Sequence, residues 1–206
     1  MAYIVGISGG SASGKSTFIK KLKEVFSDTD LSVLSQDHYY KPLHLQLIDK
    51  NDEINFDEPE SLNLDKFLAD IEILESGNEL VIDEYHFNNV NKIPNIIAIK
   101  PAAIIIVEGL FIMNRSDISN KLDLKIFIDA DEEIKFNRRL KRDSEERGMN
   151  ISEIHYQWHS QVVPSFKKYL LPYKEKADIL ITNNYDFEVG LNSVIERIQK
   201  LLIPNL

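Results

Sequence analysis

Residues 9–17 read Gly-Gly-Ser-Ala-Ser-Gly-Lys-Ser-Thr and fit the phosphate-binding loop pattern G-x-x-x-x-G-K-S/T. Glycines in such a loop let the backbone curl until successive N–H groups point at phosphate oxygens. The lysine adds a positive charge for the β- and γ-phosphates, and the hydroxyl after it can ligate Mg²⁺. A glycine-rich turn with an incidental lysine is the alternative, so the flanking sequence has to decide.

The flanking residues favour the phosphate-binding interpretation. Residues 3–7 form a short apolar run typical of a buried strand, and apolar residues recur at helical spacing from Phe18 to Phe26. A strand, a glycine loop and a helix N-terminus in this order place a bound anion at the positive end of the helix dipole. The loop therefore predicts a nucleoside triphosphate site, with these nucleotide-binding residues: Gly9, Gly10, Ser11, Ala12, Ser13, Gly14, Lys15, Ser16 and Thr17.

Apolar strand-like runs alternate with helical patterns along the chain. Short, fully apolar strands separated by helices indicate a parallel sheet covered on both faces. The sequence thus predicts an α/β fold of the P-loop NTPase type in one domain, 1–206, with ligands at the carboxyl ends of the strands. The expected strands are 3–7, 31–36, 102–107, 125–129 and 178–182, and the expected helices are 15–26, 61–76, 131–146, 152–170 and 186–202.

Two segments interrupt this alternation. Residues 38–60 are polar and aromatic without a clear period, and a loop of this length is usually functional. Residues 79–100 contain two short strand patterns on either side of Asn88, which indicates a β-hairpin arm.

A third segment, residues 131–150, gathers cations in an otherwise acidic chain. Arg138 and Arg142 lie four residues apart on the expected helix, where they repel each other unless an anion lies between them. An anion-binding helix face is one interpretation, and a solvated helix face is the other.

Two carboxylates follow predicted strands and are therefore expected at the same sheet edge as the loop. Asp37 comes directly after 31–36, where it could accept a proton from an acceptor hydroxyl or help to hold a metal; a capping role in a turn is the equal alternative. Glu108 closes the apolar run 102–107, where a carboxylate is costly unless it faces a metal, a cation or solvent. We take Glu108 as a candidate Mg²⁺ ligand.

The 206 residues carry a net charge of −9, which excludes general nucleic-acid binding because no overall positive field would attract a phosphate backbone. The longest apolar run, 102–107, is too short to cross a bilayer, and the first residues lack a signal-peptide pattern. The chain has no cysteine. Together these features favour a cytoplasmic protein with a small-molecule substrate and with neither a nucleic-acid nor a membrane partner.

Motifs over nearly the whole chain resemble the uridine kinases (uridine–cytidine kinases), in the phosphoribulokinase/uridine kinase group of P-loop kinases. The first three motifs below are the specific part of this resemblance. They are Gly-Ile-Ser-Gly-Gly-Ser-Ala-Ser-Gly-Lys-Ser at 6–16, Ser-Gln-Asp-His-Tyr-Tyr-Lys at 35–41, Asn-Phe-Asp-Glu-Pro-Glu-Ser-Leu at 55–62, Val-Glu-Gly-Leu at 107–110, Phe-Ile-Asp-Ala-Asp at 127–131, Arg-Arg-Leu-Lys-Arg-Asp at 138–143, Glu-Arg-Gly at 146–148 and Lys-Ala-Asp-Ile-Leu-Ile at 176–181.

The resemblance implies ATP-dependent phosphorylation of the 5′-hydroxyl of a pyrimidine nucleoside, uridine or cytidine, as in pyrimidine salvage, with Mg²⁺. Family members are commonly homotetramers restrained by CTP, so a homo-oligomer, a tetramer or a dimer, is expected. The implied residues are catalytic Asp37, Lys15 and Arg138; acceptor-binding Tyr40, Phe56, Tyr85, Phe87 and Arg138; Mg²⁺-holding Ser16, Glu108 and Asp37; and the lid residues Arg139, Arg142 and Arg147, which join the nucleotide-binding set.

Departures from the family pattern leave the acceptor open. Val90 and Lys92 stand in the arm where the family usually has His and Arg, and the side chain of Val90 cannot hydrogen-bond a pyrimidine edge. Met149 replaces an arginine of the lid. A second hypothesis therefore keeps the reaction and changes the acceptor to another hydroxylated metabolite, such as nicotinamide riboside or pantothenate. A third hypothesis is a nucleotide-dependent switch or binding module, although an arginine lid suits a closed transferase site better.

Overall fold

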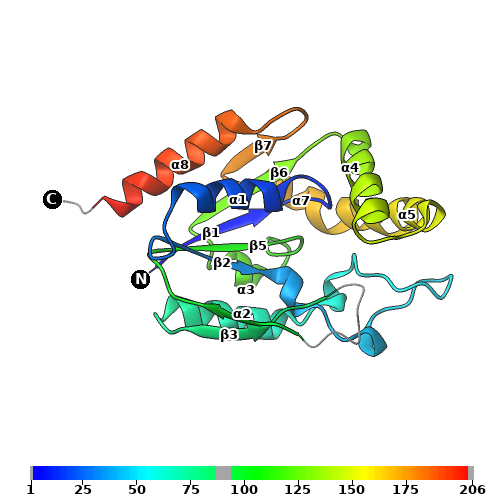
Figure 1. Cartoon of the computed structure of the whole chain (residues 1–206), viewed down its shortest axis with the longest axis horizontal. Helices are drawn as coiled ribbons and strands as arrows, with labels where there is room; N and C mark the ends of the chain where they lie inside the picture. The colour runs from blue at the N-terminus through cyan, green and yellow to red at the C-terminus, as the bar shows by residue number, and fades with distance from the viewer. Residues whose placement is uncertain (1, 87–93, 204–206) are drawn as a thin grey trace.

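The five apolar runs pair into one parallel sheet whose central strand leads into the phosphate-binding loop (Figure 1). The computed structural model describes residues 2–86 and 94–203. Every neighbouring pair of strands in this sheet is parallel, which confirms the predicted fold class. Across the sheet the order is β2 (Leu31–Ser35), β5 (Ile104–Gly109), β1 (Tyr3–Ser8), β6 (Leu124–Asp129) and β7 (Ile179–Thr182).

Helices cover both faces of the sheet, as expected for strands that are apolar on both sides (Figure 1). One core lies between the sheet and two helices, with Phe18 and Val194 fully buried in it. The core on the opposite face contains the equally buried Phe67 and Phe111. The helices are α1 (Lys15–Val25) and α8 (Glu188–Leu202) on the first face, and α2 (Leu64–Glu75) and α3 (Ser116–Ser119) on the second.

The hairpin arm exists as a separate two-stranded antiparallel sheet, β3 (Leu80–Asp83) with β4 (Ile96–Ile99). Side chains alternate along β3, so that Leu80 and Ile82 are buried towards α2 while Val81 is exposed. The turn between these strands, with Phe87, Val90 and Lys92, lies outside the described residues.

The lid helix, α4 (Glu132–Glu145), is anchored at its first turn. Asp129, at the end of β6, accepts a hydrogen bond from Lys135 Nζ at 2.6 Å and one from Lys174 Nζ at 2.7 Å. Both Asp129 and Lys135 are buried, so this pair joins the sheet edge, the start of the lid and residue 174. The helical segments beyond the lid are α5 (Ile151–Gln157), α6 (Val163–Ser165) and α7 (Leu171–Lys174), separated by the π-helical turns η4 (Trp158–Val162) and η5 (Phe166–Leu170).

The long loop predicted at 38–60 has little regular structure. It contains short 3₁₀ turns and takes part in two isolated antiparallel bridges, Tyr40 with Leu62 and Ile48 with Ile54. The turns are η1 (Gln36–Tyr39), η2 (Leu43–Leu45) and η3 (Pro59–Ser61).

Element boundaries differ from the predictions by a few residues, for local reasons. β2 ends at Ser35 because its hydroxyl accepts the N–H of Asp37 at 3.2 Å and starts a 3₁₀ turn. α2 begins at Leu64, later than expected, because Asn63 caps it by accepting the N–H of Lys66 at 3.1 Å. Over the two described stretches, none of the helices combines the length and apolar character needed to span a membrane.

Packing of α1 against α8 and the sheet is expected to set the stability of the loop's scaffold. The Phe18 ring is fully buried and meets Phe187 edge-on at 5.4 Å between centroids. Phe18→Ala should lower the free energy of unfolding by about 3–5 kcal/mol, because it removes buried area and leaves a cavity. Urea denaturation measures this, and Val25→Ala, on an exposed position of the same helix, should change stability by about 0.5 kcal/mol or less. Equal losses in both variants would contradict this account of the core.

Candidate functional site

The phosphate-binding loop takes a shape that side chains would block. Gly14 has φ +104°, and a Cβ there would lie 2.2 Å from Nδ2 of Asn183. That amide donates to the carbonyl oxygen of Ser13 at 2.8 Å. At Gly9, a Cβ would lie 2.1 Å from the carbonyl oxygen of Ile128. Glycine is therefore required at both ends of the loop, as the sequence pattern predicts.

Lys15 opens α1 and folds back over the loop. Its Nζ donates to the carbonyl oxygens of Gly9 at 3.0 Å and of Gly10 at 3.3 Å. Burial lowers the pKa of the Lys15 amine, and the nearby charges of Glu108 and Asp37 act in the opposite direction. The loop thus holds a cation at the position where a phosphate would need it.

Glu108 and Asp37 meet at the carboxyl edge of the sheet through Ser35. Ser35 lies directly opposite Glu108 in the β2–β5 register, and its hydroxyl donates to Oε1 of Glu108 while accepting the N–H of Asp37. Burial, with the charge of Asp37, raises the pKa of Glu108 to about 7. The sequence-based placement of both carboxylates beside the loop is correct.

One cavity of about 750 Å³ brings most of the predicted site residues together. Of the described candidates, Gly9, Gly10 and Tyr85 are not among its lining residues, and Phe87 lies outside the described residues. The predicted residues that line it are Ser11, Ala12, Ser13, Gly14, Lys15, Ser16, Thr17, Asp37, Tyr40, Phe56, Glu108, Arg138, Arg139, Arg142 and Arg147.

Aromatic rings form the wall opposite the loop. Tyr40 packs edge-on against Phe56 at 5.6 Å between centroids and lies tilted against Tyr85 at 5.5 Å. Asp57, next to Phe56, is a buried carboxylate in the same wall, and burial raises its pKa. The motif at 55–62 was recognised in the sequence, but Asp57 was not predicted as a site residue. The available signal was its place directly after Phe56 and two residues before Pro59.

The lid arginines share one counterion. Asp143 is fully buried and accepts from Nε of Arg142 at 2.7 Å, while Arg139 Nε lies 3.1 Å and Arg147 Nη1 3.3 Å from its carboxylate. The repulsion expected between lid arginines is thus partly relieved from within the lid. Three guanidinium groups around one carboxylate leave an excess of positive charge facing the cavity.

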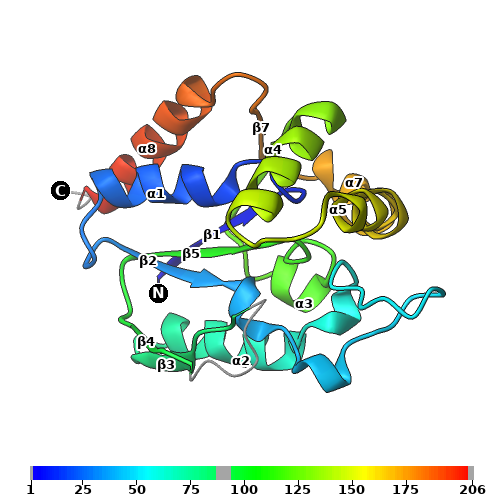
Figure 2. The same ribbon diagram turned by 45° about the vertical axis from the view of Figure 1, so that its right-hand side comes forward.

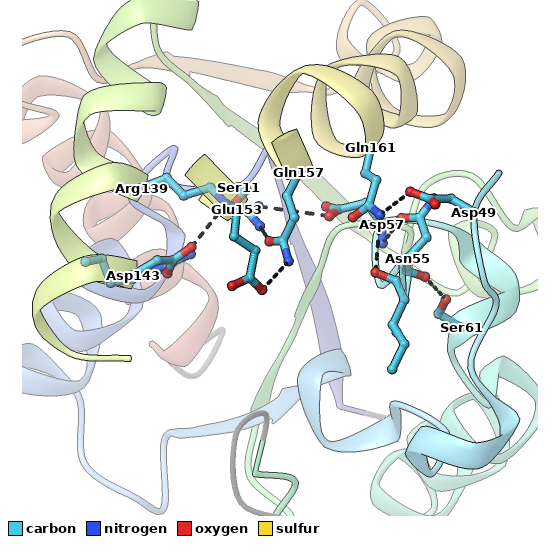
Figure 3. A network of polar contacts seen from close by, with 12 residues as sticks. Ser11, Asp49, Asn55, Asp57, Ser61, Arg139, Asp143, Glu153, Gln157 and Gln161 are labelled. Carbon is cyan, nitrogen blue, oxygen red and sulfur yellow. Dashed lines mark hydrogen bonds and ion pairs between the residues drawn. The ribbon is translucent and has the colours of Figure 1, made fainter. Parts of the chain in front are cut away.

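Arg139 lies between the loop, α5 and Asp57 (Figure 3). Its guanidinium donates to Oε1 of Gln157 at 2.8 Å and to Oγ of Ser11 at 3.3 Å, and lies 3.9 Å from Oδ2 of Asp57. Arg139 therefore links the loop, α5 and the aromatic wall. Gln157 and, one turn later, Gln161 also line the cavity and were not singled out from the sequence, since only the helix packing turns them inward.

A second cavity of about 320 Å³ adjoins the loop on the side of α8. It shares Gly14, Thr17 and Arg138 with the main cavity. Arg138 thus stands on a wall common to both, and its Nη1 is buried without a hydrogen-bond partner in the part of the chain that the structure describes. The remaining lining residues are Lys21, Asn183, Tyr185, Asp186, Phe187 and Glu188.

The residues present fit a divalent cation bound together with phosphate. The Ser16 hydroxyl and the carboxylates of Glu108 and Asp37 line one cavity, and a buried carboxylate with a raised pKa is stabilised when a cation approaches it. Within residues 2–86 and 94–203, no three His, Cys, Asp or Glu side chains gather as a metal cage. Mg²⁺ in phosphate sites needs only one or two carboxylates, because substrate phosphates and water complete its shell.

A triphosphate at the loop and a second molecule at the aromatic wall would meet beside Asp37, under cationic side chains. The fold and this site together define a P-loop phosphotransferase. The chain belongs to the Phosphoribulokinase / Uridine kinase family, whose model matches residues 4–189. It is a P-loop kinase of the uridine kinase group, which confirms the family resemblance found in the sequence.

Curated relatives align over nearly the whole chain. A protein named uridine kinase from Clostridium novyi (strain NT) is 30% identical, covering 98% of this chain and 97% of its own length. One of the same name from Staphylococcus aureus (strain JH9) is 31% identical, covering 97% and 96%. "Uridine kinase-like protein 5" of Arabidopsis thaliana is 33% identical over 99% of this chain, which spans only 44% of that longer protein.

Solved structures share the fold. One titled a possible uridine kinase, from Bacillus stearothermophilus, superposes with a TM-score of 0.62 at 13% identity, covering 87% of this chain and 88% of the other. D-glycerate 3-kinase from Cryptococcus neoformans gives 0.58 at 14% identity, covering 88% and 86%.

Burial of Glu108 predicts a pH-dependent stability in metal-free protein. Its folded-state pKa of about 7 exceeds the ordinary glutamate pKa of 4.5, so the folded state binds more protons and loses stability as pH rises from 4.5 through 7. The loss from this group should be about 3 kcal/mol. Urea denaturation at pH 5 and pH 8, with EDTA present, measures this loss. The loss should disappear in Glu108→Gln and persist in Glu24→Gln, which changes an exposed acid. A wild-type difference that persists in Glu108→Gln would assign the effect to other groups.

Proposed function

We propose that this kinase transfers the γ-phosphoryl group of ATP to the 5′-hydroxyl of a pyrimidine nucleoside, uridine or cytidine. The observation that carries the proposal is the single cavity that places Lys15 and Ser16 opposite an aromatic wall with Asp37 and Asp57. The curated relatives named uridine kinase, aligned over almost their whole length, support this choice of acceptor.

On the donor side, the loop N–H groups and Lys15 bind the β- and γ-phosphates, and the base occupies the second cavity beside Tyr185 and Arg138. Ser16, Glu108 and Asp37 hold Mg²⁺, which supplies charge neutralisation at the phosphates. Arg142 and Arg147 stabilise negative charge that develops on the transferred group.

On the acceptor side, flat rings stack on the planar base: Tyr40 and Phe56, joined by Tyr85 and Phe87 of the arm. Asp57 and Arg139 bind the ribose hydroxyls, since a buried carboxylate and guanidinium offer an acceptor and donors. Asp37 accepts the proton of the attacking hydroxyl. Closure of the lid excludes water, which would otherwise compete as the acceptor.

Nicotinamide riboside is the second candidate acceptor, favoured by one specific observation. Glu146 and Glu153 line the main cavity, together with the uncharged Met149. These carboxylates attract a cationic pyridinium ring, a group that pantothenate lacks.

The switch hypothesis has one sequence feature in its favour, since Asn120-Lys121-Leu122-Asp123 matches the guanine-reading pattern N-K-x-D. The structure places these residues away from the loop. Asp123 Oδ2 accepts the N–H of Ile4, at the opposite end of β1, and Lys121 pairs with Glu72 and Glu75. The motif is therefore structural, and a kinase remains the better interpretation.

An acceptor panel tests the proposed function. ADP formation should be measured with ATP, Mg²⁺ and uridine, cytidine, nicotinamide riboside, pantothenate or no acceptor. Turnover with uridine or cytidine at least about tenfold above the no-acceptor rate is expected. Turnover with nicotinamide riboside alone would shift the assignment to the second candidate. An ATPase rate that no acceptor changes would revive the switch.

Asp37 is expected to act as the general base. Asp37→Asn keeps the side-chain shape and removes the proton acceptor, so kcat should fall about 10²–10⁴-fold while the Kd for ATP stays near the wild-type value. Steady-state kinetics and equilibrium nucleotide titration separate these effects. Asp28→Asn, at an exposed position, is the control and should leave both quantities unchanged. Near-normal turnover in Asp37→Asn would remove Asp37 from this role.

A further inference from the structure

A turn within the long loop is docked on the helix that follows the lid. Residues 47–55 fold back on themselves: Asp49 N–H donates to the carbonyl of Glu53 at 2.8 Å, and Asn55 N–H donates to that of Leu47 at 2.9 Å. The loop projects on the same side of the molecule as α5 (Figure 2). We call residues 47–55 the docking turn.

Two side chains of the docking turn contact the helix: Asp49 through its carboxylate, and Asn51, whose Nδ2 donates to the Tyr156 hydroxyl at 2.6 Å. Its Oδ2 accepts from the Tyr156 hydroxyl at 2.7 Å and from Gln161 Nε2 at 2.8 Å, while Oδ1 accepts the N–H groups of Asn51 at 2.8 Å and Glu53 at 3.2 Å. Hydrogen bonds to a charged acceptor are about twice as strong as neutral ones. Both carboxylate oxygens are therefore occupied, one within the turn and one by the helix.

The docking turn leads directly into the acceptor wall (Figure 3). Gln161 Nε2 also donates to the carbonyl of Ile54 at 3.2 Å. Asn55 then accepts the N–H of Asp57 on its side chain at 2.9 Å, and its carbonyl accepts the Ser61 hydroxyl at 2.6 Å. Phe56 and Asp57 thus follow directly on a backbone segment that is held at two carbonyl groups. Gln161 holds the carbonyl of Ile54, and the Ser61 hydroxyl holds that of Asn55.

The same helix also holds the lid. Gln157 lies one turn before Gln161 and accepts the guanidinium of Arg139. One helix face therefore contacts the wall through Gln161 and the lid through Gln157, and Asp49 orients Gln161 from outside the cavity.

We propose that Asp49 is a positioning residue for the acceptor: by fixing Tyr156 and Gln161 it sets the place of Phe56 and Asp57 in the wall. The inference rests on the proposed function for the identity of the acceptor. Asp49 does not line the cavity and touches no reacting group. Its hydrogen bonds, first that from Tyr156, lower its pKa to about 2, so the carboxylate is charged in any assay near neutral pH.

The test compares Asp49→Asn with Tyr156→Phe. Asparagine has one acceptor oxygen, so it cannot serve both the turn and the helix. Phenylalanine keeps the ring and removes the hydroxyl that donates to Asp49 and accepts from Asn51. The KM for the acceptor should rise about tenfold in Asp49→Asn and less in Tyr156→Phe, and the KM for ATP should stay within about twofold of wild type. The two effects should add to less in the double variant than in the single variants summed, because both changes break the Asp49–Tyr156 hydrogen bond.

Asp52→Asn is the matched control. It makes the same change of charge in the same turn, its φ of +61° suits asparagine, and its side chain has no hydrogen bond or ion pair to the residues that the structure describes. All kinetic constants should be unchanged. An unchanged acceptor KM in Asp49→Asn, or an equal rise in the KM for ATP, would overturn the proposal.

The wild-type enzyme separates this proposal from the proposed function. If it phosphorylates neither uridine nor cytidine, the pyrimidine assignment fails, and the same KM comparison is made with the acceptor that the panel identifies. If no acceptor is found, amide hydrogen exchange decides: faster exchange at Asp57 in Asp49→Asn supports the positioning role, and unchanged exchange overturns it. Should Asp49→Asn fail to fold, Tyr156→Phe gives both measurements by itself.

Discussion

The site is organised around the cost of burying the carboxylate of Glu108 at the edge of an apolar sheet. A charge in that position needs compensation, and the protein supplies only part of it, through the Ser35 hydroxyl and the charge of Lys15. The raised pKa of Glu108 reflects this incomplete compensation of its charge. A cation with its phosphates would complete the compensation, so the geometry that makes Glu108 unfavourable alone also makes it a good ligand. The orientation of the Ser35 hydroxyl, which donates to Glu108, meets part of that requirement.

A similar balance governs the lid, with the signs reversed. Arginines intended for an anion must be kept apart, or neutralised, when no anion is bound. Asp143 neutralises only part of the charge of Arg139, Arg142 and Arg147, and it does so from a fully buried position. The cavity therefore has a positive wall before any phosphate is bound, which is what electrostatic preorganisation requires.

Much of the fold could be predicted because its signals are local. Apolar runs, helical spacing and the glycine pattern of the loop each depend on neighbouring residues, and the five strands and the hairpin arm were found in this way. Asp37 and Glu108 could be placed because carboxyl ends of parallel strands share one edge.

The residues that sequence reasoning missed owe their positions to tertiary packing. Gln157 and Gln161 face the cavity only because of how the helix after the lid packs, and Asn183 reaches the loop across 170 positions of sequence. Adjacent arginines on a helix point in different directions, so the pattern alone does not assign Arg139 to the wall with Asp57 and Arg138 to the wall between two cavities.

The ion pair between Asp129 and Lys135 has a mechanical consequence. It fixes the first turn of α4, a helix about 20 Å long, to the sheet edge. Arg139 lies one turn from this ion pair, whereas Glu145 ends the helix at the far side. Any rotation of α4 about the ion pair would therefore displace Arg139 least and the C-terminal end of the helix most.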